Sequence, residues 1–268
     1  MIWPRVFTAI LLITFVIGCL FFTSAPLFDL LSAGLFVIAH YEWTGLCQMS
    51  SWLWRGVLSV LFGVCLLGLF VLSPAYYPFL FLGALGLWIL LLYWTSVHRG
   101  TFPWLLRNPT SRLLIGYVVL GIAWFGLHLI RAHDKGSQWI LCLLVIVCSS
   151  DTAAYFVGRA WGKRLFAPLI SPKKTWAGFW GGLVGAFTVA LGCFWWMDLS
   201  RSQLPYFIIM SLILIMLAIY GDLFESCVKR VANKKDSGNL LPGHGGVLDR
   251  IDSLLPTLPF FAWYLTGI

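Results

Sequence analysis

The chain alternates between long uncharged apolar runs and short breaks that carry charges, proline or glycine. A helix that crosses a membrane needs about 20 mostly apolar residues. Eight runs approach this length, and a weaker ninth run follows Pro26 and Asp29. The runs cover residues 6–22, 30–39, 56–72, 79–97, 113–130, 136–150, 176–197, 203–221 and 253–268. This pattern predicts nine transmembrane helices, of which the second and the ninth have the least defined bounds.

Composition favours lipid as the solvent of this chain. Hydrophobic residues make up 60% of the 268 residues and charged residues only 10%, whereas soluble domains carry about 25% charged residues. Because so few charges cannot cover a water-facing surface, we predict an all-α polytopic membrane protein. The first run, preceded by Arg5, also has the form of a signal peptide. Since further spans follow it, we expect it to be retained.

The predicted spans divide the chain into two regions. We expect about five N-terminal transmembrane helices in residues 1–135 and about four in residues 136–268, with catalytic loops at 158–175 and 222–252. With nine helices, 15 of the 18 lysine and arginine residues fall on the side of the N-terminus, and Arg131, Lys135 and Arg201 fall on the other. Because basic residues concentrate in cytoplasmic loops, the N-terminus and both catalytic loops are predicted to be cytoplasmic.

Charged residues gather in the C-terminal half, around the two predicted loops. Six of the ten acidic residues belong to this group: Asp151, Asp222, Glu225, Asp236, Asp249 and Asp252. Asp222, Ser226 and Lys229 are spaced by four and three, so they share one face of a helix. A carboxylate at the end of an apolar run is costly unless it is paired or coordinated. Asp222 is therefore a functional candidate.

A glycine-rich turn at residues 242–246 lies between these charges, where the backbone can approach a ligand closely. Carboxylate oxygens are ligands for Mg2+, and cations neutralise the charge that develops on a transferred phosphate. The combination favours phosphoryl or nucleotidyl transfer. A basic surface that only sets topology and binds anionic headgroups is the alternative, which we favour for the acid-free loop with Arg99, Arg107 and Arg112.

The spacing of these residues resembles one enzyme family. The pattern is Ser226-x-Val228-Lys229-Arg230-x4-Lys235-Asp236-x-Gly238-x2-Leu241-Pro242-x-His244-Gly245-Gly246-x2-Asp249-Arg250-Ile251-Asp252. It resembles the signature of the phosphatidate cytidylyltransferases, or CDP-diacylglycerol synthases. Residues 151–159 followed by 171–178 are similar to a second motif of that family, and Tyr41-Glu42-Trp43 is a weaker match.

The resemblance implies a reaction in which a phosphate oxygen of phosphatidic acid attacks the α-phosphorus of CTP and expels pyrophosphate. The product, CDP-diacylglycerol, would serve phospholipid biosynthesis. Such an enzyme needs positioning and charge neutralisation, often from two metal ions. The resemblance also implies Mg2+ with a second ion of open identity, a bacterial inner-membrane location and a homodimer. CTP, phosphatidic acid and membrane lipid are the expected partners, and nucleic acid is not.

On this resemblance we assign roles to individual residues. Asp222 and Asp249 are the predicted metal ligands, and the candidates for further ligands are Asp236, Asp252 and Asp151. The predicted catalytic residues are Asp222, Ser226, Lys229, Asp249 and Arg250. The predicted substrate-binding residues are Ser171, Lys173, Lys174, Arg230, Lys235, His244, Gly245 and Gly246.

These assignments have structural alternatives. Asp222 and Asp249 could instead form ion pairs with Lys229 or Arg250. His244 is as well suited to stabilising the turn or touching a phosphate as to acting as a base. Other charged residues could anchor loops or pair with one another: Lys173, Lys174, Asp151 and Arg159. Four glycines are expected to serve helix packing: Gly178, Gly181, Gly182 and Gly185.

Three other functions compete with a cytidylyltransferase. A transporter or channel for an anionic solute would also use cations and intramembrane acids, but it does not explain a charge cluster confined to loops on one side. A membrane CDP-alcohol phosphotransferase would carry a DG-x-x-AR motif, which the sequence lacks. A CTP-dependent polyprenol kinase remains. Only a cytidylyltransferase would place CMP on the lipid and release pyrophosphate.

Overall fold

The computed structural model describes residues 3–97, 104–241, 243 and 245–267, and most of them are helical. The helices are α1 (Trp3–Phe22), α2 (Ala25–Leu46), α3 (Trp52–Phe70), α4 (Tyr77–Val97), α5 (Trp104–Arg107), α6 (Pro109–Ala132), α7 (Gly136–Trp161), α8 (Trp176–Trp196), α9 (Leu204–Val231), α10 (Leu248–Ile251) and α11 (Leu254–Thr266). Short 3-10 turns at Pro74–Tyr76 and Arg201–Gln203 precede α4 and α9. An antiparallel hairpin of β1 (Leu165–Ala167) and β2 (Ser171–Thr175) joins α7 to α8.

Length and apolar composition identify the helices that can cross a membrane. Within the described residues six segments meet both criteria: Trp52–Phe70, Pro74–Trp94, Pro109–Ala132, Gly136–Trp161, Trp176–Trp196 and Arg201–Val231. Shorter apolar stretches lie in α1 and α11, while α2 carries Asp29, His40 and Glu42 among its apolar residues. The chain is therefore a helical, multi-pass membrane protein. A helix overlaps each predicted run, but the count of nine spans stays a prediction.

Local polar groups set where two of the helices around the site begin. Asn108 precedes α6, and its side-chain oxygen accepts a hydrogen bond of 2.8 Å from the Thr110 N–H, with Pro109 in the first helical position. Thr175 ends the hairpin and begins α8 by accepting a hydrogen bond of 3.1 Å from the Gly178 N–H. Thr175 therefore fixes the turn between the hairpin and α8.

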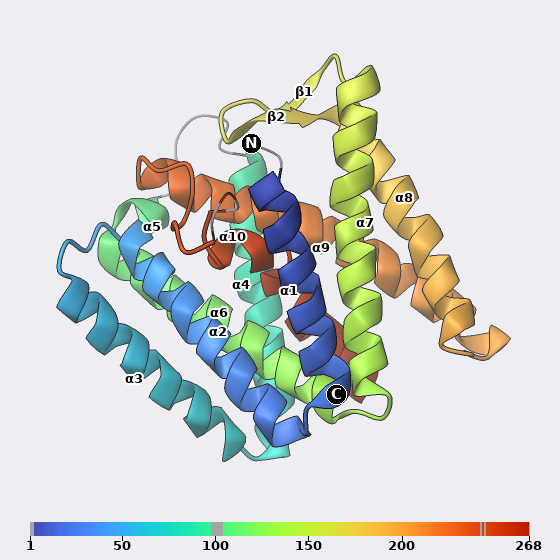
Figure 1. Cartoon of the computed structure of the whole chain (residues 1–268), viewed down its shortest axis with the longest axis horizontal. Coiled ribbons are helices and arrows are strands. Elements are labelled where there is room, and N and C mark those ends of the chain that lie inside the picture. Colours follow the sequence, from blue (N-terminus) through green and yellow to red (C-terminus); the bar gives the residue numbers. More distant parts are fainter. Residues whose placement is uncertain (1–2, 98–103, 242, 244, 268) are drawn as a thin grey trace.

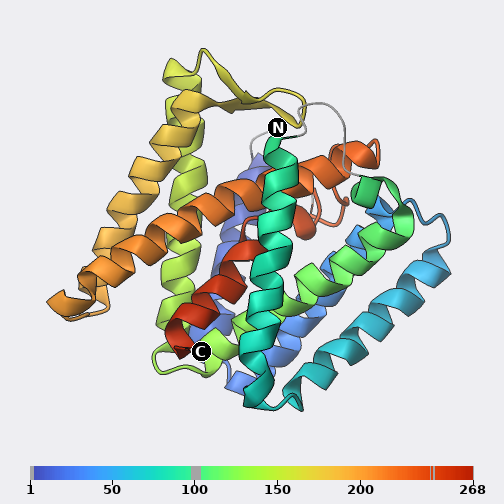
Figure 2. The same ribbon diagram turned by 180° about the vertical axis from the view of Figure 1, so that it is seen from behind.

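Helices α7 and α8 run side by side, and small residues bring them close together (Figures 1 and 2). A Cβ atom added at Gly182 would lie 2.9 Å from the Ser150 carbonyl oxygen, and one at Gly185 would lie 2.5 Å from Ala153 Cβ. Any larger side chain would separate the two helices. The packing role predicted for the glycines of this segment is confirmed.

The N-terminal and C-terminal regions of the chain share one core. Helix α11 packs on α4, α6 and α9, while α2 packs on α3, α6 and α10. Figure 2 shows α9 crossing the other helices obliquely through this core. Trp43 on α2 is fully buried, and its Nε1 donates a hydrogen bond of 2.8 Å to the Arg112 carbonyl oxygen on α6. Residues 1–135 thus contribute directly to the surroundings of the C-terminal elements.

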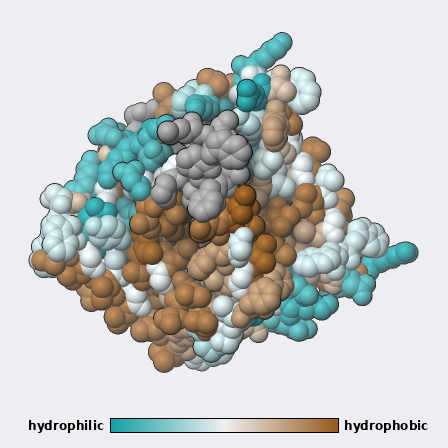
Figure 3. Space-filling view, viewed as in Figure 1, coloured by the Kyte–Doolittle hydropathy of each residue, from teal (hydrophilic) through white to brown (hydrophobic). Residues whose placement is uncertain are grey.

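Much of the surface is apolar, as lipid contact requires. Figure 3 shows hydrophobic residues across the lower and central part of one face, with hydrophilic residues along the edges. Phe15 and Phe22 project from α1 and are 49% and 86% exposed. In water such large exposed side chains would favour aggregation or association. On this chain they are suited to contact with acyl chains.

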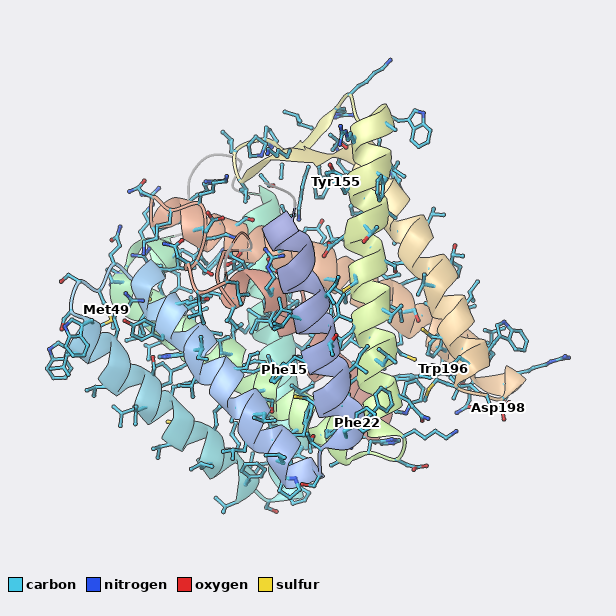
Figure 4. The ribbon with its side chains drawn as sticks, viewed as in Figure 1. Phe15, Phe22, Met49, Tyr155, Trp196 and Asp198 are labelled. Atoms are coloured by element: carbon cyan, nitrogen blue, oxygen red, sulfur yellow. The ribbon has the colours of Figure 1, made fainter. Side chains whose placement is uncertain are left out.

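The structure differs from the predicted loops in two ways. Residues 158–161 still belong to α7, and residues 222–231 still belong to α9, so both helices run beyond the predicted apolar runs. The rest of the first predicted loop contains the short hairpin, which the all-α expectation did not include. Figures 1 and 2 place this hairpin and the start of α1 at the same end of the molecule. In Figure 4, Tyr155 lies near the hairpin, whereas Trp196 and Asp198 lie at the far end of α8.

Candidate active site

The last turns of α9 carry three of the predicted catalytic residues on one face. Ser226 Oγ donates a hydrogen bond of 3.3 Å to Asp222 Oδ1, one helical turn away. Lys229 lies a further turn along and forms an ion pair with Glu225, whose side chain is fully buried. The shared face predicted from the spacing is confirmed. Glu225 was not assigned a role from the sequence.

Asp249 is enclosed by donors from three parts of the chain. Its Oδ1 lies 2.6 Å from Lys229 Nζ. Its Oδ2 accepts hydrogen bonds from the Ser237 N–H at 2.9 Å, the Ser237 hydroxyl at 2.8 Å and the Gly246 N–H at 2.8 Å. Burial favours a higher pKa for this carboxyl, but the donors outweigh burial and hold the pKa of Asp249 below its usual range. Asp249 is therefore ionised and firmly oriented.

Two cations that were predicted to bind substrate connect the hairpin with α9. Lys174 Nζ lies 2.7 Å from Asp222 Oδ2, and both side chains are about one quarter exposed, at 26% and 28%. Arg230 donates hydrogen bonds of 3.3 Å and 3.4 Å to the carbonyl oxygens of Ile170 and Lys234. Lys174 thus lies beside a predicted metal ligand, whereas Arg230 binds backbone oxygens.

Three more predicted residues belong to this cluster. Asp151, on α7, interacts electrostatically with Asp222, Lys174 and Arg250. Asp252 follows α10, and a Cβ atom added at Gly221 of α9 would lie 2.7 Å from its carbonyl oxygen. Burial, and after it the nearby charge of Asp222, raises the pKa of Asp252 to about 8. Elements from α7 to α10 therefore gather their acids at one place.

The loop before α10 depends on a residue that was noted in the sequence only as part of a weak match. Glu42, near the end of α2, is 5% exposed and accepts hydrogen bonds from the Val247 N–H at 3.1 Å and the Leu248 N–H at 2.8 Å. A Cβ atom at Gly246 would overlap both the Glu42 carboxylate and Ser237 Oγ, so only glycine fits there. The signal available in the sequence was an acid within an apolar helix, which is costly unless it serves a purpose.

The other predicted substrate-binding residues lie around this cluster. Ser171 is half-buried, while Lys173, Lys235 and Asp236 are exposed. Gly245 has a φ of +82°, which a glycine adopts freely, and its carbonyl oxygen accepts a hydrogen bond of 2.9 Å from the Leu241 N–H. The Gly246 N–H is already bonded to Asp249. His244 lies outside the described residues, as does Arg99 of the basic loop.

The charge balance of the cluster suits a divalent cation. Asp151, Asp222, Glu225, Asp249 and Asp252 gather with only three cations: Lys174, Lys229 and Arg250. Within the described part of the chain, no three His, Cys, Asp or Glu side chains form a ready metal-binding group. Mg2+ typically needs only one or two protein carboxylates, with substrate phosphates completing its ligands. A divalent cation would favour the ionised forms of these crowded acids, so the cluster fits a cation that arrives with a phosphate substrate.

The sequence model of the cytidylyltransferase family matches residues 3–267. This chain belongs to the cytidylyltransferase family. The match covers every helix described above, so membership applies to the membrane-spanning part as well as to the charged cluster.

Curated members of the cytidylyltransferase family resemble the chain from end to end. The phosphatidate cytidylyltransferase of Pseudomonas aeruginosa is 34% identical over 269 residues, covering 98% of this chain and 96% of the relative. That of Haemophilus influenzae is 33% identical over 287 residues, covering 98% of both. That of Bacillus subtilis is 37% identical over 216 residues, covering 76% of this chain and 77% of the relative.

Proposed function

We propose that the chain is a phosphatidate cytidylyltransferase, which transfers CMP from CTP to phosphatidic acid and releases pyrophosphate. The observation that carries the proposal is the similarity to the Pseudomonas relative of that name across 98% of the chain. The structure supports it because the cations and carboxylates that nucleotidyl transfer requires lie together on α7, β2, α9 and α10.

The reaction needs no nucleophile from the protein, since the lipid phosphate supplies the attacking oxygen. The P–O bond between the α-phosphorus and the bridging oxygen of CTP breaks as the new bond to phosphatidic acid forms, and pyrophosphate carries away the electron pair. Lys174, Lys229 and Arg250 are assigned to the phosphates, where their charge counters the negative charge on the transferring group. Ser226 is assigned to a phosphate oxygen.

Asp222 and Asp249 are assigned to Mg2+, with Asp151 and Asp252 as neighbouring carboxylates. A carboxylate oxygen has about two lone pairs, and among the described residues Lys229 is the donor to Asp249 Oδ1. This leaves a lone pair for a cation. The bound metal would supply charge neutralisation and alignment of the phosphates. The chain's own part is to hold its carboxylates in place and to present Lys174 and Lys229 beside them.

The ion pairs of the two lysines indicate how the site is kept ready before substrate binds. Lys174 forms an ion pair with Asp222, and Lys229 forms ion pairs with Asp249 and Glu225. When a triphosphate binds, Asp222 and Asp249 would hold Mg2+, and the two lysines would turn to the phosphates. Before substrate binds, these ion pairs keep the lysines and the aspartates from standing as unpaired charges in a low-dielectric site.

A labelled-substrate assay tests the proposed reaction. The purified protein is supplied with phosphatidic acid and with CTP labelled in either the α- or the γ-phosphate. We expect α-label in the lipid product and γ-label in pyrophosphate. Label transferred from the γ-phosphate to a lipid would indicate a kinase instead, and the absence of any CTP-dependent lipid product would refute the proposal.

Two further properties are proposed on the family resemblance. The first is a location in the bacterial inner membrane, which fractionation with an inner-membrane marker tests. The second is a homodimer, which light scattering of the detergent-solubilised protein tests. A monomeric mass with full activity would contradict the homodimer.

A further inference from the structure

Glu42 connects the N-terminal helices to the loop before α10. It lies at the end of α2, and its partners Ser237, Val247 and Leu248 are about 200 positions away in the sequence, with separations of 195, 205 and 206. Each of its two oxygens faces a backbone N–H. Oε1 faces Val247 and Oε2 faces Leu248. This arrangement requires an acceptor at both positions.

Ser237 links the Glu42 carboxylate to that of Asp249. Its hydroxyl lies 2.8 Å from Asp249 Oδ2 and 3.2 Å from Glu42 Oε2. A hydroxyl has a single hydrogen, so Ser237 shares that hydrogen between the two carboxylates, with the shorter contact to Asp249. Glu42 therefore holds the loop on one side of Ser237, while the loop holds Asp249 on the other side.

The surrounding glycines show that the contact leaves little free space. A Cβ atom at Gly238 would overlap the Glu42 side chain, just as one at Gly246 would. Lys234 adds a second connection between the loop and α2 by donating a hydrogen bond of 3.0 Å to the Gly45 carbonyl oxygen. The loop is thus fitted around the end of α2 on both flanks.

From these contacts we infer that Glu42 is a positioning residue for the reaction, which fixes the loop of residues 237–248 and so the orientation of the Asp249 carboxylate. The hydrogen bonds of Glu42 run to Ser237, Val247 and Leu248, and not to the side chains that the proposed function assigns to phosphate. Glu42 acts on the metal site through Ser237 and through the amides that begin α10. This inference rests on the proposed function, in which Asp249 binds Mg2+.

Glutamine at position 42 is the sharpest substitution because it keeps the size of the side chain. Glutamine has one acceptor oxygen and one NH2 group. In either orientation of the amide, the NH2 group opposes the N–H of Val247 or Leu248, so one contact becomes a donor–donor clash. Asp29→Asn is the matched control, since Asp29 is a largely buried acid on the same helix that contacts His128 at the opposite end.

The experiment uses the full-length protein and three readouts. These are hydrogen–deuterium exchange of peptides from residues 236–250, Mn2+ affinity by electron paramagnetic resonance, and separate kcat and KM values. For Glu42→Gln we expect faster exchange in that segment and a loss of about 10- to 100-fold in Mn2+ affinity and kcat, as is typical when a residue supporting a metal ligand is removed. The KM for phosphatidic acid should not change. Asp29→Asn should leave all three readouts unchanged.

Unchanged exchange, Mn2+ affinity and kcat in Glu42→Gln would overturn the inference. If this variant does not fold, Ser237→Ala decides, because it removes only the hydroxyl between the two carboxylates. Weaker Mn2+ binding in Ser237→Ala would support the inference, and unchanged binding would overturn it. Asp249→Asn separates the two proposals. If it binds Mn2+ normally, the metal assignment is wrong, and loop exchange alone then decides the role of Glu42.

Discussion

The two segments that meet the end of α9 are held in opposite ways. The loop of residues 237–248 is fixed by two buried carboxylates, Glu42 and Asp249, which accept hydrogen bonds from its amide and hydroxyl donors. The hairpin of β1 and β2 is held by the partly exposed pair of Lys174 and Asp222 and by the contact of Arg230 with the Ile170 carbonyl oxygen. The loop is held by buried hydrogen bonds, whereas the hairpin is held by partly exposed contacts with α9.

The difference indicates that the loop and the hairpin have separate roles in the site. Hydrogen bonds to a buried carboxylate are costly to break, so the loop keeps Asp249 in one orientation throughout the reaction. A partly exposed ion pair contributes only about 0–1 kcal/mol, so Lys174 can leave Asp222 when a triphosphate arrives. The contrast between a fixed acid and a releasable cation can be tested residue by residue.

The largest effects are expected for the two predicted metal ligands, and they should differ in stability. Asp222→Asn and Asp249→Asn should each lower transfer by at least about 100-fold. Only Asp249→Asn should also lower the free energy of unfolding, by about 1–3 kcal/mol, because it leaves buried donors without an acceptor. Assays of CTP-to-lipid transfer against Mg2+ concentration, with thermal unfolding in detergent, measure both. Equal loss of stability in the two variants would contradict the contrast.

The two cations beside the fixed loop, on α9 and α10, come next. Lys229→Ala and Arg250→Ala should lower kcat by about 10²- to 10³-fold, equivalent to about 2.7–4 kcal/mol, with the protein still folded. The reason is that a charge–phosphate contact strengthens as negative charge develops. Arg201→Ala, on the far side of the predicted membrane, serves as the control. Near-normal turnover in both folded variants would show that these cations have a structural role and do not act on the phosphates.

A smaller effect is expected on the hairpin. Lys174→Gln should raise the KM for CTP by about tenfold or somewhat more, as expected for losing one hydrogen bond to a charged group, with little change in unfolding temperature. Lys173→Gln should have the smaller effect, since Lys173 is exposed whereas Lys174 contacts Asp222. Steady-state kinetics at saturating phosphatidic acid compare them. A larger effect at Lys173 would mean that the wrong lysine has been assigned to the nucleotide.

No effect on activity is expected from the last test, which concerns sidedness. Single cysteines at positions 173 and 235 should react with an impermeant reagent from the cytoplasmic side only, and one at position 201 from the opposite side only. The variants are made in a background without the seven native cysteines. Labelling of position 235 from outside intact cells would show that the predicted topology is inverted.

The helical framework could be predicted from the sequence because burial in lipid leaves a direct trace in hydropathy. The ends of α7 and α9 could not be predicted in the same way. Hydropathy loses its signal at Asp151 and Asp222, but the helices continue because polar residues one turn apart satisfy each other, as Glu225 and Lys229 do. The predicted loop of residues 222–252 therefore begins about ten residues too early, because α9 continues to Val231.

The candidate site was predicted where its residues follow a local spacing and missed where they do not. Asp222, Ser226 and Lys229 lie on one helical face, and their contacts could be anticipated. The ion pair between Lys229 and Asp249 could be anticipated only as one of several possible ion pairs. The role of Glu42 could not be read from the sequence, because no periodicity connects residues 195 to 206 positions apart. Long-range contacts of this kind are decided by packing.

The contact between Glu42 and Leu248 also imposes an order on biogenesis. A ribosome adds about 5–20 residues per second, so the 206 positions between these residues take roughly 10–40 s to synthesise. During that interval α2 is already made, yet the amides that will bind its glutamate are not. An unpartnered carboxylate is too costly to hold in an apolar surrounding. The end of α2 must therefore stay near water, bind other donors or take up a proton until residues 237–248 emerge and close over it.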